Sequence, residues 1–278
     1  MDERSGRNGE GASGEESLLG PGEPHPVELI NPDGRSAFFL TCDHAGRRLP
    51  ARLGNLGLPD TELVRHIAWD IGIAAVARRV ADALDAALVS QIYSRLAIDC
   101  NRPPDAPSSV PIVSESTAVP GNHDLSPAER DRRVRDVFRP YHDRIEAELD
   151  RRTAAGRSTV LVAMHSFTPV YKGERRPWHV GTLYGRDDRL ARPLHAALVR
   201  AGDLVVGDNE PYAVSDETDY TIPVHAERRG LLHVGIEVRQ DLIEFEDGQA
   251  RWAELLSRTL IDAARAATAP VDTPTATT

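Results

Sequence analysis

The sequence predicts an α/β fold in which a mixed, mostly parallel sheet is covered by helices on both faces. Two observations carry this prediction. Short apolar segments typical of strands alternate along the chain with longer segments whose apolar residues have helical spacing. The most continuous apolar segment, Thr159–Met164, suits the centre of a parallel sheet, where both faces of a strand are buried. No internal repeat or obvious linker interrupts the pattern, so a single domain is expected.

The first half of the chain is predicted to contain three strands and two helices. A long Pro/Ser-rich stretch, 101–124, separates the two halves of this region and is typical of a lid or binding loop. The sequence from Ser126 to Glu129 predicts a capping box with proline at the first helical position. The expected strands are 37–42, 88–93 and 96–100, and the expected helices run from about 60 to 87 and from 126 to just before Gly156.

The second half continues the alternation. Strands are expected at 159–164, 180–184, 204–206 and 231–236, and helices at 188–201 and about 250–266. Residues 1–25 are rich in Gly, Glu and Ser and are predicted to be disordered, because so polar a segment gains too little from burial to offset ordering. The predicted domain covers 26–267, and the Thr/Pro/Ala-rich residues 268–278 are expected to form a flexible tail.

The composition argues against two classes of binding partner. The 278 residues include 33 basic and 43 acidic side chains, a formal charge of −10, which argues against a nucleic acid or an anionic membrane as partner. No apolar run approaches the roughly 20 residues of a membrane span. The N-terminus lacks the basic and apolar regions of a secretory signal, so a cytoplasmic location is expected. The sequence does not indicate an oligomeric state.

Four apolar, strand-like segments end on polar groups that are suited to catalysis. Ligands of open α/β sheets bind at the carboxyl ends of the strands, so these groups are expected to line one cleft. Two imidazoles, a carboxylate and a guanidinium together are the groups that a metal-assisted amide hydrolase needs. The residues at these ends are His44, Asn101 with Arg102, His165, and Glu237 with Arg239.

His44 and His165 are predicted to bind a metal ion. A lone histidine such as His165 can also have its ring nitrogens satisfied by the backbone, but two histidines in equivalent positions favour a metal site. Neutral imidazole is the commonest metal ligand, and catalytic zinc takes three protein ligands and a water. Asp70 lies one expected helical turn after His66. Asp70 either forms a hydrogen bond on the helix surface, or acts as a metal ligand or as the partner of a ligating histidine.

Glu237 is predicted to be the general base. Burial in an apolar strand raises the pKa of a carboxyl toward neutrality, as a base for an activated water requires. The alternative is a structural salt bridge with Arg239, two residues along on the same face of the strand. Arg102, with Asn101, is suited to bind a substrate carboxylate. Arg95 is expected in the same region, and the sequence does not decide which arginine is structural.

Loops that precede the Glu237 strand supply two further candidates for substrate binding or for a lid. These are Asn209, in a Gly-Asp-Asn-Glu-Pro-Tyr sequence, and His225. Turn formation alone also explains Asn209.

Taken in order, these segments resemble the N-formylglutamate amidohydrolase (deformylase) family. The matching sequences are CDHAG, HIAWDIGIA, YSRLAIDCNR, MHSF, GDNEPY and HAERRGLLHVGIEVRQDLI, which span residues 39 to 243. The family is related in fold to zinc carboxypeptidases and aspartoacylase-type deacylases. The resemblance therefore implies a three-layer αβα fold with a central sheet of about eight strands, and hydrolysis of a small anionic N-acyl amino acid.

The resemblance also implies roles for individual residues, with one departure. His44 and His165 would bind one Zn²⁺, Arg102 with Asn101 would hold the substrate carboxylate, and Glu237 would be the base. The glutamate of the relatives' His-x-x-Glu motif would fall at residue 47, which is Arg47 here. The third ligand must then come from elsewhere, and Asp70 is preferred to Asp43, because in a strand Asp43 would point away from His44.

Three functions follow as alternatives. The first is metal-dependent hydrolysis of an N-acyl amino acid of the N-formyl-L-glutamate type, with formate and the free amino acid as products. The second is a peptidase or deacylase that acts on another N-acyl substrate. The third is a non-catalytic binding module with the same fold, which Arg47 favours.

Overall fold

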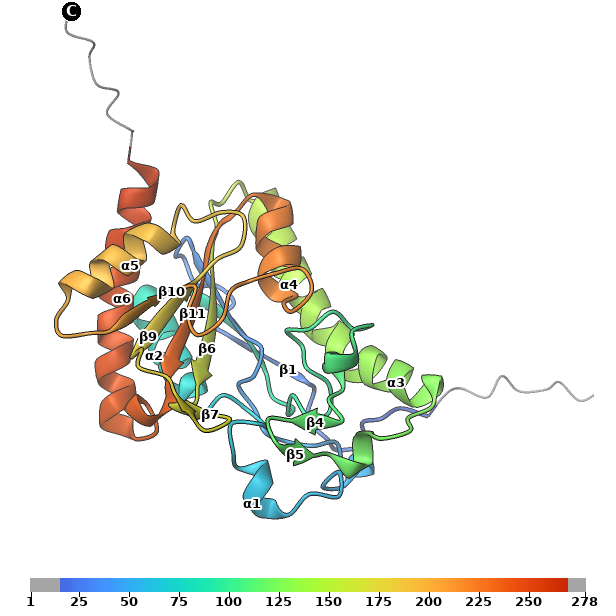
Figure 1. Cartoon of the computed structure of the whole chain (residues 1–278). Helices are drawn as coiled ribbons and strands as arrows, with labels where there is room; N and C mark the ends of the chain where they lie inside the picture. Colours follow the sequence, from blue (N-terminus) through green and yellow to red (C-terminus); the bar gives the residue numbers. More distant parts are fainter. Residues whose placement is uncertain (1–15, 270–278) are drawn as a thin grey trace, which may run out of the picture.

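A seven-stranded mixed sheet forms the centre of the computed structural model, which describes residues 16–269 (Figure 1). The strand order is β1-β3-β2-β6-β11-β9-β10. Strands β3, β2, β6 and β11 are parallel neighbours, as are β9 and β10, whereas β1 and β9 run antiparallel to β3 and β11. The strands are β1 (Val27–Ile30), β2 (Phe38–Cys42), β3 (Ala87–Gln91), β6 (Val160–Phe167), β9 (Val180–Leu183), β10 (Val206–Asp208) and β11 (Leu232–Arg239).

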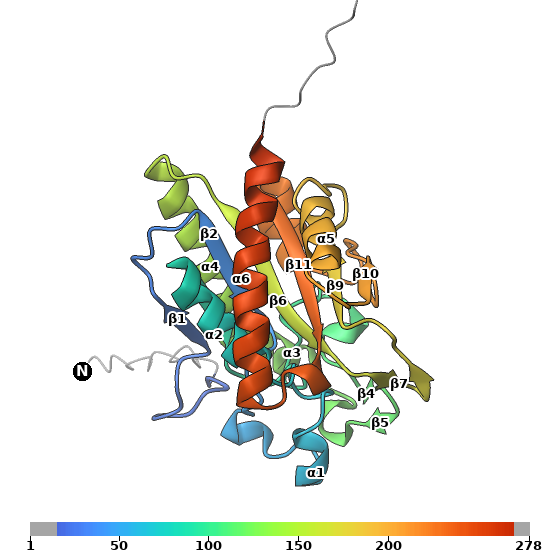
Figure 2. The same cartoon turned by 90° about the vertical axis from the view of Figure 1, so that its left-hand side faces the viewer.

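Helices cover both faces of the sheet and confirm the three-layer α/β prediction, with seven strands where about eight were expected. Figure 2 shows α6 crossing one face, with α2 and α5 on either side of it. The opposite face is covered by α4, which follows α3 and a short π-helical segment, Val134–Phe138. The helices are α1 (Asp60–Leu63), α2 (Ile73–Leu84), α3 (Pro127–Arg133), α4 (Arg139–Ala154), α5 (Ala191–Arg200) and α6 (Glu246–Thr268).

The alternation of side chains along β6 and β11 places two candidate residues on one face. In β6, Val162 and Met164 join the apolar core beneath α2, α5 and α6, whereas Ala163 joins the core on the α4 side. His165 follows Ala163 by two residues and therefore faces the α4 side. Glu237 of β11 pairs directly with His165 in the parallel register. The two side chains are therefore neighbours on the same face of the sheet.

The helix expected from about 60 to 87 is interrupted, and that part of the prediction was wrong. Residues 64–72 form turns between α1 and α2. Gly72 adopts a positive φ of 80°, and a Cβ there would lie 2.1 Å from the carbonyl oxygen of Ile243, so only glycine fits. The Asp70 N–H donates to the carbonyl oxygen of His44 at 3.0 Å. The interruption therefore brings Asp70 beside His44. The helical spacing of the apolar residues predicts a continuous helix and does not indicate this break.

The strand expected at 96–100 is a series of turns instead. Its carbonyl groups are satisfied by side chains rather than by a neighbouring strand: Asn122 donates to Leu96 O at 2.9 Å, and Arg133 donates to Ala97 O at 2.7 Å. Because Arg133 is buried, its bond to Ala97 O also supplies a partner that its guanidinium requires. Asn101 and Arg102 therefore follow a turn and not a strand end.

The remaining elements agree with the prediction to within a few residues at their ends. The capping box is confirmed, because Ser126 Oγ accepts the Glu129 N–H at 3.3 Å and the Glu129 carboxylate accepts the Ser126 N–H at 2.8 Å. The sequence analysis missed strand β1 and two short hairpins. These hairpins are β4–β5 (Val113–Ser114 and Thr117–Ala118) and β7–β8 (Val170–Tyr171 and Glu174–Arg175).

Part of the segment predicted to be disordered contacts the domain. Leu18 is buried in the core on the α4 side, and its N–H donates to the Asp136 carboxylate at 2.5 Å. Tyr93 Oη donates to Pro24 O at 3.0 Å. These contacts begin before residue 26, the predicted start of the domain, whereas residues 1–15 and 270–278 lie outside the described residues.

Within residues 16–269, no helix has both the length and the apolar character needed to cross a membrane.

Candidate active site

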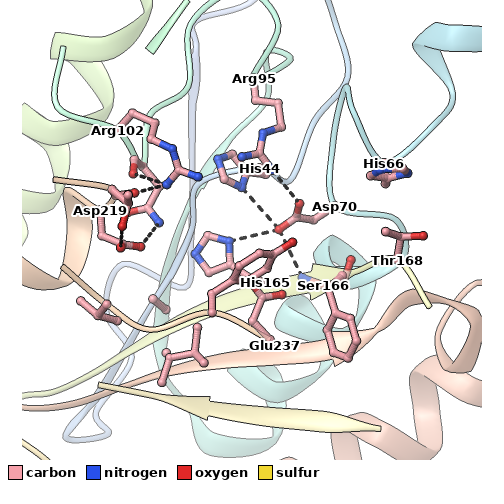
Figure 3. A pocket seen from close by; sticks show the side chains of 18 of the residues that line it. His44, His66, Asp70, Arg95, Arg102, His165, Ser166, Thr168, Asp219 and Glu237 are labelled. Carbon is pink, nitrogen blue, oxygen red and sulfur yellow. Dashed lines mark hydrogen bonds and ion pairs between the residues drawn. The ribbon is translucent and has the colours of Figure 1, made fainter. Parts of the chain in front are cut away.

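A cavity of about 310 Å³ lies at the carboxyl ends of β6 and β11, on the α4 side of the sheet (Figure 3). Its volume is at the lower end of the range for small-molecule sites. The long loop after residue 100 supplies part of the wall, as expected. The polar and aromatic lining residues include His44, His66, Asp70, Arg95, Asn101, Arg102, Glu115, His165, Tyr171, Tyr212, Asp219 and Glu237.

Three buried side chains in this cavity could hold a metal ion. His44, Asp70 and His165 each offer one ligand atom, and these atoms all lie within 4.8 Å of one another. Asp70 Oδ2 is at the centre, 3.4 Å from His44 Nδ1 and 3.1 Å from His165 Nδ1. Figure 3 shows the two imidazoles directed toward this carboxylate, His165 from β6 and His44 from the turn that follows β2. The structure therefore brings together the three residues that the sequence proposed as ligands.

The far nitrogen of each imidazole is held by a second buried carboxylate. His44 Nε2 lies 2.7 Å from Asp99 Oδ1, and His165 Nε2 lies 3.1 Å from Asp43 Oδ2. Ligating histidines commonly donate their other N–H to a carboxylate, which fixes the ring and its tautomer. This arrangement directs Nδ1 of both rings toward Asp70. Among the described residues, His44 Nδ1 and His165 Nε2 have no hydrogen-bond partner, whereas His165 Nδ1 is hydrogen-bonded to Asp70 Oδ2 at 3.1 Å.

The charges of the site depend on one another. Burial alone would raise the pKa of Asp70, but His44 and His165 hold it far below its usual range. Burial would likewise lower the pKa of His165, but hydrogen bonds to Asp43 and Asp70 raise it well above normal. Without a metal the imidazoles are therefore favoured as cations. A metal ion that binds at Nδ1 would displace these protons and take over the compensation of the carboxylates.

Glu237 has the properties of a general base. Its side chain is buried, and burial raises its pKa to about 7, against the opposing effect of His165. Within the part of the chain that the structure describes, Glu237 Oε2 has no hydrogen-bond partner. In Figure 3 the carboxyl lies beside His165 and Asp70. A carboxyl that titrates near neutral pH and faces the cavity is suited to accept and return a proton.

The two arginines of the cavity differ in their charge partners. Arg95 is neutralised, because its guanidinium contacts Asp99 at 2.6 Å and Asp70 at 3.5 Å. Arg102 donates to the carbonyl oxygens of Asn101 and Thr218 and, within residues 16–269, has no carboxylate partner. Arg102 therefore has its charge available for an anion, whereas the charge of Arg95 is offset by Asp99 and Asp70.

Asn101 lines the cavity but positions a loop. Its Oδ1 accepts the N–H groups of Tyr220 and Thr221 at 3.1 Å each, and its Nδ2 donates to Asp219 at 3.1 Å. These contacts hold residues 219–221 in place, next to Thr218, whose carbonyl oxygen accepts from Arg102.

Arg239, Asn209 and His225 do not line this cavity. Arg239, the last residue of β11, pairs with Asp241 at 2.8 Å and donates to the carbonyl oxygens of Pro177 and Trp178 at 3.4 Å each. Asn209 has a positive φ of 52°, and its Oδ1 accepts the Tyr184 N–H at 2.9 Å, so it serves a turn. Arg239 and Asn209 therefore have structural partners outside this cavity.

His225 is buried on the other side of the cavity wall, where it pairs with His142. His142 Nε2 lies 2.8 Å from Cys100 O, and its Nδ1 lies 2.9 Å from His225 Nε2. Because a carbonyl only accepts, His142 carries its proton on Nε2 and accepts the His225 N–H. Burial lowers the pKa of His142 to about 4 and that of His225 to about 3. Both rings are therefore neutral at pH 7.

This histidine pair predicts a loss of stability in mild acid. The unfolded chain takes up a proton at each histidine near pH 6.5, whereas the folded protein resists this until about pH 4, so stability falls as pH drops between these values. A His142→Gln variant should remove up to about 1.4 kcal/mol per pH unit of this dependence. Urea unfolding of the variant and the wild type at pH 4.5, 5.5 and 6.5 measures how the free energy of unfolding changes with pH. An equal change with pH in both proteins would contradict the assignment of His142 as a buried, neutral histidine.

Arg47 and His66 differ in their position relative to the cavity. Arg47 is exposed and stacks on Trp69, with 5.5 Å from the guanidinium carbon to the ring centroid, so it does not enter the cavity. Asp70, and not Arg47, is grouped with His44 and His165 in the cavity. His66 lines the cavity but contacts Glu115 at 3.5 Å, since the break in the helix separates it from Asp70.

Sequence reasoning missed Asp99 and the role of Asp43. Asp99 precedes Asn101 by two residues and supports both His44 and Arg95. Asp43 was considered only as a ligand, yet it contacts His165 Nε2 and accepts the Thr221 hydroxyl at 2.7 Å. The signal that was available is a pair of acidic residues adjacent to the proposed ligands, in the sequences Cys-Asp-His and Asp-Cys-Asn-Arg.

Comparisons with known proteins agree with this site. Residues 36–244, more than half of the chain, match the family model described as N-formylglutamate amidohydrolase. The N-formylglutamate deformylase of Pseudomonas putida is 27% identical over 196 residues, which is 60% of this chain and 68% of the relative.

Two solved structures share the fold. A gene product of Agrobacterium tumefaciens is 41% identical, with a TM-score of 0.86 and coverage of 89% of this chain and 98% of that chain. The N-formylglutamate amidohydrolase of Ralstonia eutropha JMP134 is 19% identical, with a TM-score of 0.65 and coverage of 87% and 98%. At that identity, the second likeness establishes the fold alone.

Proposed function

The chain belongs to the N-formylglutamate amidohydrolase family, enzymes that act on an amide bond, and on this premise we propose which bond it cleaves. The substrate is an N-acyl amino acid of the N-formyl-L-glutamate type, and the products are formate and the free amino acid. The observation that supports the proposal most strongly is the convergence of His44, Asp70 and His165 in the cavity that Glu237 and Arg102 also line.

The ligand set fits Zn²⁺. Two imidazoles and a carboxylate, with a further position open to the cavity, form a donor set that catalytic zinc uses. His44 Nδ1, His165 Nδ1 and the Asp70 carboxylate would hold the ion. When bound, it would polarise the acyl carbonyl and lower the pKa of a water molecule.

Residues of this chain bind and orient the substrate. Arg102 holds the α-carboxylate, since its guanidinium has no carboxylate partner among the described residues and is fixed by two carbonyl oxygens. Asn101 keeps residues 219–221 in place beside it. Binding at this point presents the acyl group to the three proposed metal ligands.

Glu237 then moves the proton. Its Oε2, which lacks a hydrogen-bond partner in residues 16–269, accepts a proton from the water that attacks the acyl carbon. The same oxygen returns that proton to the amide nitrogen as the C–N bond breaks. A pKa of about 7 allows the carboxyl to act in both directions near neutral pH.

A hydrolysis panel on zinc-loaded protein tests this function. N-formyl-L-glutamate, N-acetyl-L-glutamate and a glutamyl dipeptide are assayed for release of the free amino acid. We expect the formyl compound to have the highest kcat/KM and to yield one formate per glutamate. Preference for the acetyl compound or the dipeptide would indicate another deacylase or a peptidase, and no hydrolysis of any of the three would refute the proposal.

A further inference from the structure

A second cationic region lies at the rim of the cavity, on hairpin β7–β8. Residues 171–176, Tyr-Lys-Gly-Glu-Arg-Arg, carry three basic side chains and one acidic one in a chain of net charge −10. This segment includes Lys172, the only lysine of the protein. Tyr171 of the hairpin lines the cavity. The local excess of positive charge therefore lies where an anionic substrate enters.

Arg176 is held between two tyrosines of this rim. Its guanidinium carbon lies 4.5 Å from the ring centroid of Tyr171 and 4.8 Å from that of Tyr212. Its Nη1 also donates to Tyr212 Oη at 2.8 Å. Within residues 16–269 no carboxylate pairs with Arg176. Stacking on two rings fixes the guanidinium without neutralising it.

Tyr212 connects Arg176 to the cavity. It lines the same cavity as Arg102, and 44% of its surface remains exposed. Because its oxygen accepts from Arg176, its own O–H is free to donate to another group. Burial of its ring and the nearby Glu237 raise the pKa of the hydroxyl, so it remains a donor at neutral pH. A donor polarised by a fixed cation is suited to bind an anion.

The charge of Arg95 is not available to bind an anion, because Asp99 and Asp70 already neutralise it. Among residues 16–269, Arg102 in the cavity and Arg176 beside Tyr212 are cationic groups without a carboxylate partner, and Arg176 acts through Tyr212. A substrate with two carboxylates would satisfy both.

We propose that the Tyr212 hydroxyl, positioned and polarised by Arg176, binds the side-chain carboxylate of the substrate and selects dicarboxylic N-acyl amino acids. This inference rests on the proposed function, in which Arg102 takes the α-carboxylate. Tyr212 contacts the substrate, and Arg176 is a positioning residue.

The test compares N-formyl-L-glutamate with N-formyl-L-glutamine, which has nearly the same shape but a neutral side chain. We expect wild-type kcat/KM to favour the glutamate compound by about 10- to 100-fold, the range of a hydrogen bond to a charged group. Tyr212→Phe and Arg176→Gln should each remove most of this preference, because kcat/KM falls further for the glutamate compound, whose charged group forms the stronger hydrogen bond, than for the glutamine compound.

Arg175→Gln is the matched control, because it removes the same charge from the adjacent position, whereas the tyrosine contacts belong to Arg176. It should keep the preference. The proposal is overturned if wild-type protein does not distinguish the two compounds, or if the Tyr212 and Arg176 variants lose activity on both equally.

A binding measurement separates this proposal from the proposed function. Calorimetry with both compounds is performed on zinc-loaded Glu237→Gln protein, with and without Arg176→Gln. If wild-type protein hydrolyses neither compound, the proposed function fails. The subsite then stands only if the glutamate compound binds more tightly and Arg176→Gln abolishes that difference. Equal affinities, or no binding of either compound, would overturn it.

Discussion

Glu237→Gln is expected to lower kcat by about 10²- to 10⁴-fold, the range that a positioned general base contributes. Glutamine has nearly the same shape as glutamate but does not accept a proton at neutral pH. Glu237 lies in β11 opposite His165, and burial raises the pKa of its carboxyl to about 7, so it is suited to exchange a proton near neutral pH. The loss should fall on kcat, whereas KM should change little, because Arg102 still holds the substrate.

The measurement is steady-state hydrolysis of N-formyl-L-glutamate by variant and wild-type protein with equal zinc content. Glu115→Gln serves as a control, since Glu115 also lines the cavity but contacts Arg65 and His66 instead of the proposed ligands. We expect the control to retain kcat within about threefold, as for a substitution away from the chemistry. Near-normal turnover by Glu237→Gln would show that another group accepts the proton.

Asp70→Asn is expected to weaken metal binding by more than about 100-fold, which is the upper end of the effect of residues that only support a ligand. Asp70 Oδ2 lies within 3.4 Å of both ligating imidazoles and also accepts the Ser166 N–H at 3.2 Å. The amide removes the negative charge that offsets the ion. Hydrolysis should be lost together with the metal.

A chelator competition titration at constant pH measures this affinity. Asp219→Asn is the matched control, because Asp219 lines the same cavity but bonds to Asn101 instead of the imidazoles. The control should bind zinc as the wild type does. Equal zinc affinity of Asp70→Asn and wild-type protein would remove Asp70 from the ligand set.

The strand ends explain why much of the site was predictable from sequence. His165 and Glu237 lie in strands whose alternating burial is visible in the sequence, and parallel strands bring their carboxyl ends to one edge of a sheet. His44 follows β2 and reaches the same edge. For these residues, local pattern and sheet geometry lead to the same position.

Asp70 was predicted as a metal ligand from a helix that the structure does not contain. The sequence suggested a helix face shared with His66, whereas Asp70 lies in a turn that exists because Gly72 packs against Ile243. Such a contact joins segments about 170 residues apart, and no local periodicity reports it. The turns at 96–100 have a similar origin, since their carbonyls bond to the side chains of Asn122 and Arg133.

Arg239 and Asn209 show the limit of reasoning from neighbouring residues. Each lies close in sequence to functional groups, but the final residue of a strand and a left-handed turn position direct their side chains to other partners. Arg176 shows the reverse case. Nothing in its sequence context indicates a role, and its contact with Tyr212 depends on how a hairpin and a distant loop meet.

Anomalous diffraction at the zinc absorption edge, from crystals of zinc-loaded protein, locates the ion. We expect one strong peak per chain, bonded to the imidazoles of His44 and His165 and to the carboxylate of Asp70, with Glu237 facing it across the cavity. A peak bonded to other side chains, or no peak in this cavity while the zinc-loaded enzyme is active, would contradict this expectation.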